Sequence, residues 1–117
     1  MKRLFAISIS IFTSITLFAQ KIDTAKDLLR AGKLTEAKKE IDAIVAQEKF
    51  QKNGDAFYTK AKIYNAISMD PALSKQFPGA RLEAFNALKK YTDVDDKMLI
   101  ALQIDGYKPI NEIYTGY

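Results

Sequence analysis

The feature that most constrains the fold of this chain is the spacing of its apolar residues, which recur every three or four positions over most of residues 22–117. That spacing is typical of amphipathic helices with one buried face. Glycine and proline interrupt the pattern and divide it into separate helices. No alternating pattern typical of strands follows residue 20. The sequence therefore predicts an all-α fold of antiparallel helix pairs.

The first predicted helix pair covers residues 22–49. Gly32 ends the first helix, because glycine readily adopts the left-handed conformation found at helix C termini. Thr35 is a candidate N-cap for the second helix. The short connection makes the two helices antiparallel neighbours. The second helix is expected to present a face that is apolar except at its last position: Ala37, Ile41, Ile44, Val45 and Glu48.

A second helix pair is predicted over residues 54–92. Asn53 or Asp55 can cap its first helix. The buried face of that helix is expected to consist of Phe57, Ala61, Tyr64 and either Ile67 or Ser68. The connection over residues 69–79 contains two prolines and a glycine, with room for one helical turn between them. The second helix of the pair is expected over residues 80–91.

Residues 96–117 are predicted to begin a further unit of short helices. The aspartates that precede it are explained better by helix capping than by calcium binding, because the glycine and glutamate of an EF-hand loop are missing. Residues 98–102 are continuously apolar, so this helix is expected to be covered on more than one side. Gly106 ends it, and Pro109 suits the first turn of the last helix.

Residues 1–19 are predicted to be a secretory signal peptide. Lys2 and Arg3 form its positive start, an apolar stretch follows, and Ala19 is the small residue that a signal peptidase needs. A spanning helix needs about 20 apolar residues, so this stretch is short for a membrane anchor, which is the alternative. We expect a mature single domain of residues 20–117 in the periplasm or envelope of a Gram-negative bacterium, with no membrane span left after cleavage.

The sequence contains no Cys and no His. Disulfides, thiol catalysis, the usual zinc or copper sites and nucleophilic systems built on His or Cys are therefore excluded. The net charge of +4 falls by two when Lys2 and Arg3 are removed, and acidic residues alternate with the lysines, so no basic stripe points to nucleic acid. The composition favours a protein that is not an enzyme and uses no cofactor or metal.

Both helix pairs resemble tetratricopeptide repeats, a family of 34-residue helix pairs with small and large residues at fixed positions. The matching positions are Ala25, Leu28, Ala37 and Ile41 in the first pair and Phe57, Ala61, Tyr64, Ala84 and Leu88 in the second. Small residues let two helices approach closely, and large ones fill the space beside them. Residues 69–79 would be an insertion of about eleven residues relative to the repeat. The resemblance implies an α-solenoid fragment.

The resemblance also implies an interaction scaffold. Stacked helix pairs form a concave surface lined by the first helix of each pair, and such surfaces bind peptides or partner proteins. Residues between the buried positions of that helix would face the groove, which makes Tyr58, Lys60 and Asn65 the candidate partner-binding residues. Tyr58 lies off the apolar stripe and is the one expected to be exposed among the aromatic residues of the second pair: Phe57, Tyr58, Tyr64, Phe85 and Tyr91.

A helical bundle that serves as a structural or oligomeric subunit, without a peptide groove, is the alternative. Residues 98–102 would then form the contact between subunits. The last predicted helix, residues 110–117, carries isoleucines and tyrosines and ends without a polar cap. Residues 97–117 are therefore expected to leave apolar surface open for self-association or for packing against further sequence.

Overall fold

The computed structural model describes residues 22–115, and the regular structure of this part is entirely helical, which confirms the predicted all-α class. The first described helix covers residues 22–30. The elements that follow are α2 (Leu34–Val45), the 3₁₀ helix η1 (Glu48–Phe50), α3 (Gly54–Met69), α4 (Leu73–Gln76), α5 (Ala80–Val94), α6 (Leu99–Ile104) and α7 (Lys108–Thr115). The predicted signal peptide and Tyr117 lie outside the described residues.

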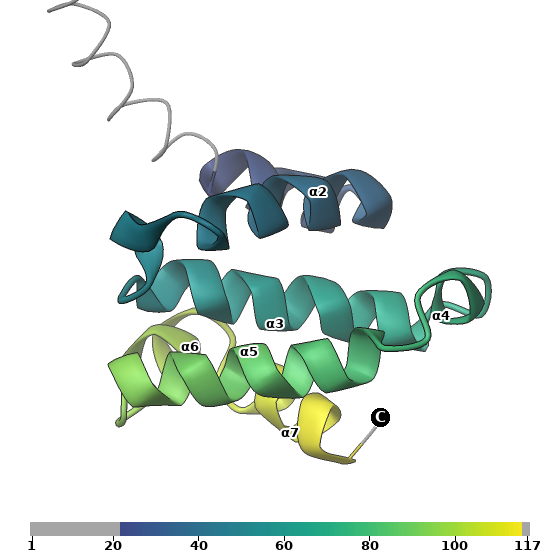
Figure 1. The fold of residues 1–117 in the computed structure, drawn as a ribbon. Helices are drawn as coiled ribbons and strands as arrows, with labels where there is room; N and C mark the ends of the chain where they lie inside the picture. The colour runs from purple at the N-terminus through teal and green to yellow at the C-terminus, as the bar shows by residue number, and fades with distance from the viewer. Residues whose placement is uncertain (1–21, 116–117) are drawn as a thin grey trace, which may run out of the picture.

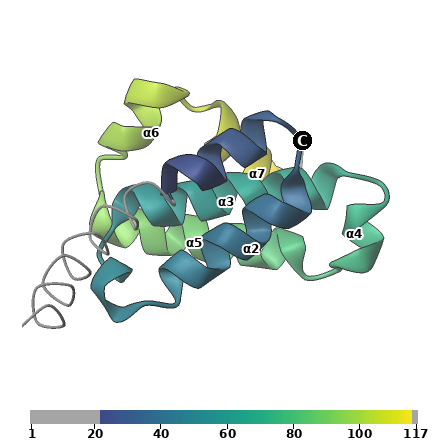
Figure 2. The ribbon, with the colours of Figure 1, turned by 90° about the horizontal axis from the view of Figure 1, so that it is seen from above.

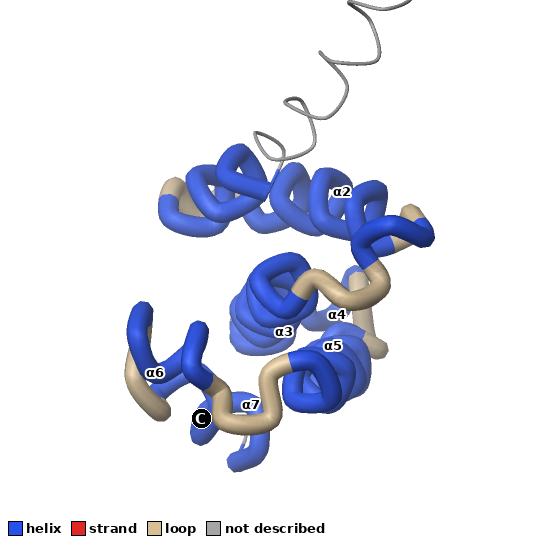
Figure 3. Tube along the Cα trace, turned by 90° about the vertical axis from the view of Figure 1, so that its left-hand side faces the viewer, coloured by secondary structure: helices blue, strands red, loops and turns tan. Residues whose placement is uncertain are grey.

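The helices form three layers with α3 at the centre (Figures 1 and 3). Residues 22–30 and α2 form one outer layer, α3 and α5 form the middle layer, and α6 and α7 lie on the other side. Seen from above, α2 lies across α3 and α5 (Figure 2). Helix α3 contacts every other labelled α-helix, and its packing with α5 is the most extensive between the described elements.

Gly32 ends the first helix as predicted. Its φ of +76° is left-handed, and the N–H of Lys33 donates to the carbonyl of Leu28 at 2.9 Å, which satisfies one of the terminal carbonyl groups. The prediction that Thr35 caps the next helix is wrong. Helix α2 begins one residue before Thr35 and has no side-chain cap, so the threonine lies inside its first turn.

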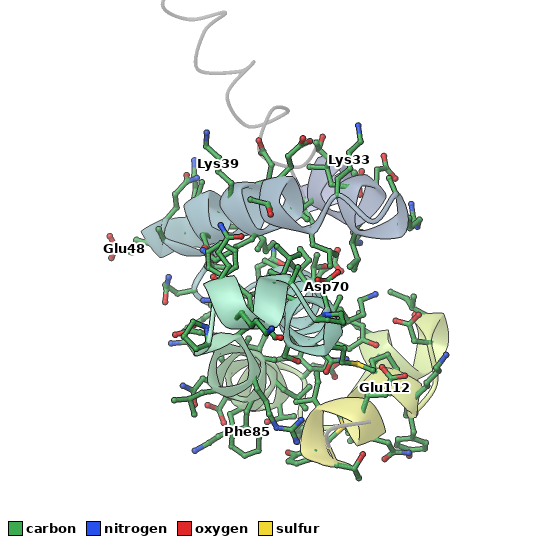
Figure 4. The ribbon with its side chains drawn as sticks, turned by 90° about the vertical axis from the view of Figure 1, so that its right-hand side faces the viewer. Lys33, Lys39, Glu48, Asp70, Phe85 and Glu112 are labelled. Carbon is green, nitrogen blue, oxygen red and sulfur yellow. The ribbon has the colours of Figure 1, made fainter. Side chains whose placement is uncertain are left out.

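Helix α2 ends at Val45, so Glu48 does not continue its buried face. Gln51 Nε2 donates to the carbonyl oxygen of Val45 at 2.7 Å and so satisfies a group at the helix end. Glu48 begins the 3₁₀ turn and points away from the protein, whereas Phe50 at the end of that turn is buried (Figure 4). The other predicted positions of this face are buried: Ala37, Ile41, Ile44 and Val45.

Helix α3 begins with the predicted cap. Asn53, rather than Asp55, supplies it, because Asn53 Oδ1 accepts from the N–H of Ala56 at 3.0 Å. Gly54 follows at a close contact with α6, where a Cβ would lie 3.3 Å from Cδ1 of Ile100. On the buried face of α3, Ile67 is buried and the alternative Ser68 is only half-buried.

The positions matched to the repeat lie in the core of the described structure. Eight of them are buried: Ala25, Ala37, Ile41, Phe57, Ala61, Tyr64, Ala84 and Leu88. Leu28 is half-buried and packs against this core. Ala25, Ala37 and Ala61 have no exposed surface, so there is little room for larger side chains at these three positions.

The connection between α3 and α5 contains one helical turn, α4, as predicted. Asp70 fixes its start, because its Oδ1 accepts from the N–H groups of Ala72 and Leu73, both at 2.9 Å. Phe77 follows α4 and is half-buried against the core. This connection therefore brings an aromatic side chain back onto the helical body.

The two C-terminal helices pack differently from the prediction. Residues 98–102 are not covered on more than one side, because α6 contacts α3 with one face: Leu99 is 60% exposed, and Ala101 is the buried residue of the helix. In α7, Ile110 and Ile113 are 5% and 2% exposed, since this helix packs on α3 and α5. The expectation that these two isoleucines leave open apolar surface is therefore wrong.

The turn between α6 and α7 follows the prediction more closely. Gly106 has a φ of +67°, and Pro109 lies in the first turn of α7, which begins at Lys108. Within residues 22–115, no helix combines the length and apolar character needed to cross a membrane.

Candidate functional site

The three predicted groove residues do not share one surface. Tyr58 is fully buried, so the prediction that it is the exposed aromatic of the second pair is wrong, and Asn65 is only 6% exposed. Tyr58 Oη donates to Asp105 Oδ2 at 2.7 Å, and Asn65 Nδ2 donates to Glu112 Oε2 at 3.2 Å. Residues near the C terminus thus cover this side of α3. Helical spacing cannot reveal contacts between residues 47 positions apart.

Lys60 lines a pocket between α2, α3, α5 and the segment that precedes α5, which we name the α2–α5 pocket. Its volume of about 650 Å³ is typical of sites that hold a small molecule or a few peptide side chains. The charged and polar groups of its lining include Lys38, Asp42, Lys60, Tyr64 and Glu83. Its apolar wall includes Val45, Phe77, Pro78 and Ala80.

Tyr64 lies at the centre of the polar groups in this pocket. Its hydroxyl donates to the carboxylate of Asp42, with oxygen distances of 2.8 and 2.7 Å. Lys38 donates to the same carboxylate at 3.1 Å. The ammonium groups of Lys38 and Lys60 lie 5.6 and 5.5 Å from the centroid of the Tyr64 ring, within the range of cation–π attraction.

The two lysines are held by further contacts. Lys60 Nζ lies 3.5 Å from Glu83 Oε2, and the glutamate side chain is 50% exposed. Lys38 Nζ lies 5.0 Å from the centroid of the Phe77 ring. The pocket therefore presents two positive and two negative groups beside an apolar wall, and it can pair with polar and apolar parts of one ligand.

Burial raises the pKa of the Tyr64 hydroxyl above its usual value, and the hydrogen bond to Asp42 raises it further. The phenol therefore remains protonated at neutral pH and acts as a hydrogen-bond donor, not as a base or nucleophile. The described residues contain no group of three or more acidic side chains placed to hold a metal ion.

A second polar cluster surrounds Asp105 on the other side of α3. Lys62 Nζ donates to Asp105 Oδ2 at 2.9 Å and lies 4.7 Å from the centroid of the Tyr58 ring. Desolvation opposes ionisation of Asp105, but the hydrogen bonds from Lys62 and Tyr58 outweigh it and lower the pKa of the carboxyl group. Burial, followed by the hydrogen bond to Asp105, raises the pKa of Tyr58. These groups attach α6 to α3.

Tyr91 connects the end of α5 to the start of α6. Its hydroxyl donates to Asp95 Oδ2 and accepts from the N–H of Ala101 at 3.0 Å. Burial and the hydrogen bond to Asp95 raise the pKa of Tyr91 to about 12. The bond from Tyr91 and the N–H of Ile100 lower the pKa of Asp95.

Sequence reasoning missed most of the pocket. Lys38 and Asp42 are four residues apart on α2, a spacing that usually marks a solvated face. Phe77 was the available signal, because it is an aromatic residue within a segment of proline and glycine. The pocket becomes visible only when α2 and the segment before α5 lie beside α3.

No family model, no curated protein and no solved structure matches this chain.

Proposed function

We propose that this protein is a non-catalytic, exported helical-repeat scaffold that binds a segment of a partner protein in the α2–α5 pocket. The observation that carries the proposal is the combination of two lysines beside the Tyr64 ring with an apolar wall in a volume of about 650 Å³. A peptide offers both backbone polar groups and apolar side chains to such a surface.

Two further observations support this proposal. The small residues shared with tetratricopeptide repeats lie at fully buried positions, as close helix packing requires. The predicted signal peptide supports a site of action in the cell envelope. Tyr58 and Asn65 are covered by the C-terminal helices, so of the three predicted groove residues the pocket retains Lys60.

A peptide library selected on the full chain tests the proposal. The selected peptides are then titrated by fluorescence polarisation against the parent chain and the variants Lys38→Ala and Phe77→Ala. Each substitution is expected to weaken binding about tenfold, as truncation of a central contact residue does. Lys39→Ala is the matched control, because Lys39 is the next residue of α2 and points away from the protein (Figure 4). Equal affinities for the parent and both pocket variants would contradict the proposal.

A homo-oligomeric subunit is the second candidate, because large apolar side chains are exposed near the C terminus: Leu99, Leu102, Ile104, Tyr107 and Tyr114. Contact between these side chains of two copies would remove apolar surface from water. On this account, Leu99→Glu combined with Ile104→Glu abolishes association in light scattering and leaves the far-ultraviolet circular dichroism spectrum unchanged.

A further inference from the structure

The C-terminal segment, residues 99–115, is attached to the rest of the protein by contacts that are distant in sequence. Asp105 accepts from Tyr58 and Lys62, and Glu112 accepts from Asn65. Ile110 and Ile113 are buried where α7 packs on α3 and α5. None of these contacts requires that the segment and α3 belong to the same copy of the chain.

The link between α5 and α6 is short and strained. Met98 is the only non-glycine residue with a positive φ among residues 22–115, with φ 53° and ψ 37°. This left-handed conformation crowds the Cβ against the backbone, and a methionine has no short polar side chain to compensate for it. Strain in a short link raises the free energy of the closed form and so favours a form in which the link is extended.

The sequence permits the link to open into a continuous helix. Residues 95–105 contain neither glycine nor proline, so α5 can extend through α6 with ordinary helical hydrogen bonds. Opening the link would break two bonds that the closed form makes. One runs from the N–H of Ile100 to Asp95 Oδ2 at 2.9 Å, and the other from the N–H of Ala101 to the Tyr91 hydroxyl. Helical bonds to the carbonyls four residues earlier would replace both.

We infer that the C-terminal segment is exchanged between two copies of this chain. In the exchanged dimer, α5 and α6 form one helix. The C-terminal segment of each copy packs on α3 of the other copy, through the same contacts that it makes with its own α3 in this structure. Exchange is reciprocal and has two-fold symmetry, so it closes at the dimer. It relieves the conformation of Met98 in both copies and keeps the bonds of Asp105 and Glu112.

The α2–α5 pocket takes no part in this exchange, since its lining residues precede residue 84. Segment exchange and the proposed peptide binding can therefore be tested separately. It also differs from association through exposed side chains, because exchange places Lys62 of one copy beside Asp105 of the other.

Isotope mixing distinguishes these arrangements. The full chain is prepared in light and ¹⁵N-labelled forms, mixed at high concentration and separated by size exclusion with light scattering. A carbodiimide then joins the Lys62 amine to the Asp105 carboxyl group, which are already in contact, and mass spectrometry identifies the linked peptides. Exchange predicts pairs that join one light and one heavy peptide in the dimer fraction. A dimer that contains only pairs of equal label, or a chain that remains monomeric at millimolar concentration, would overturn the inference.

Three variants test the role of the link. Met98→Gly removes the conformational penalty of the closed form, so it is expected to raise the dimer dissociation constant about tenfold or more. Asp95→Ala removes the acceptor that the N–H of Ile100 uses only in the closed link, and it should lower that constant. Asp105→Asn weakens docking in both forms, so it should loosen α6 in hydrogen exchange without increasing the dimer. A dimer fraction equal in the parent, Met98→Gly and Asp95→Ala would contradict the inference.

Discussion

The hydroxyl of Tyr64 in α3 donates to both carboxylate oxygens of Asp42 in α2, at distances of 2.8 and 2.7 Å. This contact joins two layers of the fold and also forms the centre of the α2–α5 pocket. The same pair therefore links the stability of the helical body to the shape of the candidate binding site.

Tyr64→Phe should lower the free energy of unfolding by about 1–2 kcal/mol, because a hydrogen bond to a charged group is lost while the ring remains. Urea unfolding followed by circular dichroism measures this difference. Tyr107→Phe is the matched control, since Tyr107 is 60% exposed and its substitution should leave the midpoint unchanged. Equal midpoints for Tyr64→Phe and the parent would show that the bond to Asp42 contributes no net stability.

Ala37→Leu and Ala61→Leu should each cost roughly 1–3 kcal/mol, because both alanines are fully buried at contacts between helices. Thermal unfolding of the two variants beside the parent measures the cost. Ala43→Leu on α2 is the control, because Ala43 is exposed. If both buried variants melt like the parent, neither position is a close contact, and the support for a repeat-like packing is lost.

Much of the fold follows from local sequence. The left-handed Gly32, the cap at Asn53 and the buried alanines were all predictable, because each depends on a residue type at a helix end or on helical spacing. The end of α2 was not predictable, since it depends on Gln51 reaching back to Val45 and on a buried Phe50.

The candidate site was much less predictable. Tyr58 lies off the apolar stripe of α3, and contacts distant in sequence explain why it is buried: its ring packs against that of Tyr91 and its hydroxyl donates to Asp105. The α2–α5 pocket needs residues from three helices and a proline-containing connection at once. Periodicity identifies the face of a helix but does not identify the segment that covers it, so the partners of a polar residue on that face stay unknown.

Export is testable directly. Expression of the full coding sequence in a Gram-negative host should yield a periplasmic protein whose N-terminal residue is Gln20, because signal peptidase cleaves after the small residue Ala19. N-terminal sequencing of the periplasmic fraction identifies that residue. Recovery of a soluble cytoplasmic product that retains Met1 would contradict the prediction.

The attachment of α6 should weaken in acid. Folding lowers the pKa of the Asp105 carboxyl group below its ordinary value of 3.8. The carboxylate therefore stabilises the fold at pH values above the pKa of the unfolded chain, and this stabilisation is lost as the pH falls through the pKa of the folded protein. The pKa of Asp95 is lowered as well and acts in the same direction. Protonation of Asp105 removes the charge that Lys62 contacts. The protection of the α6 amides, measured relative to the intrinsic exchange rate at each pH, should therefore fall at low pH.

Hydrogen exchange and urea unfolding at about pH 6 and about pH 3 measure this effect. Asp105→Asn should lower the urea midpoint at the higher pH and reduce its dependence on pH, because the variant has no carboxylate to protonate at this position. Asp96→Asn is the control, since Asp96 is exposed and belongs neither to the α2–α5 pocket nor to the polar cluster around Asp105. A pH dependence equal in Asp105→Asn and the parent would mean that the carboxylate of Asp105 does not hold α6 against α3.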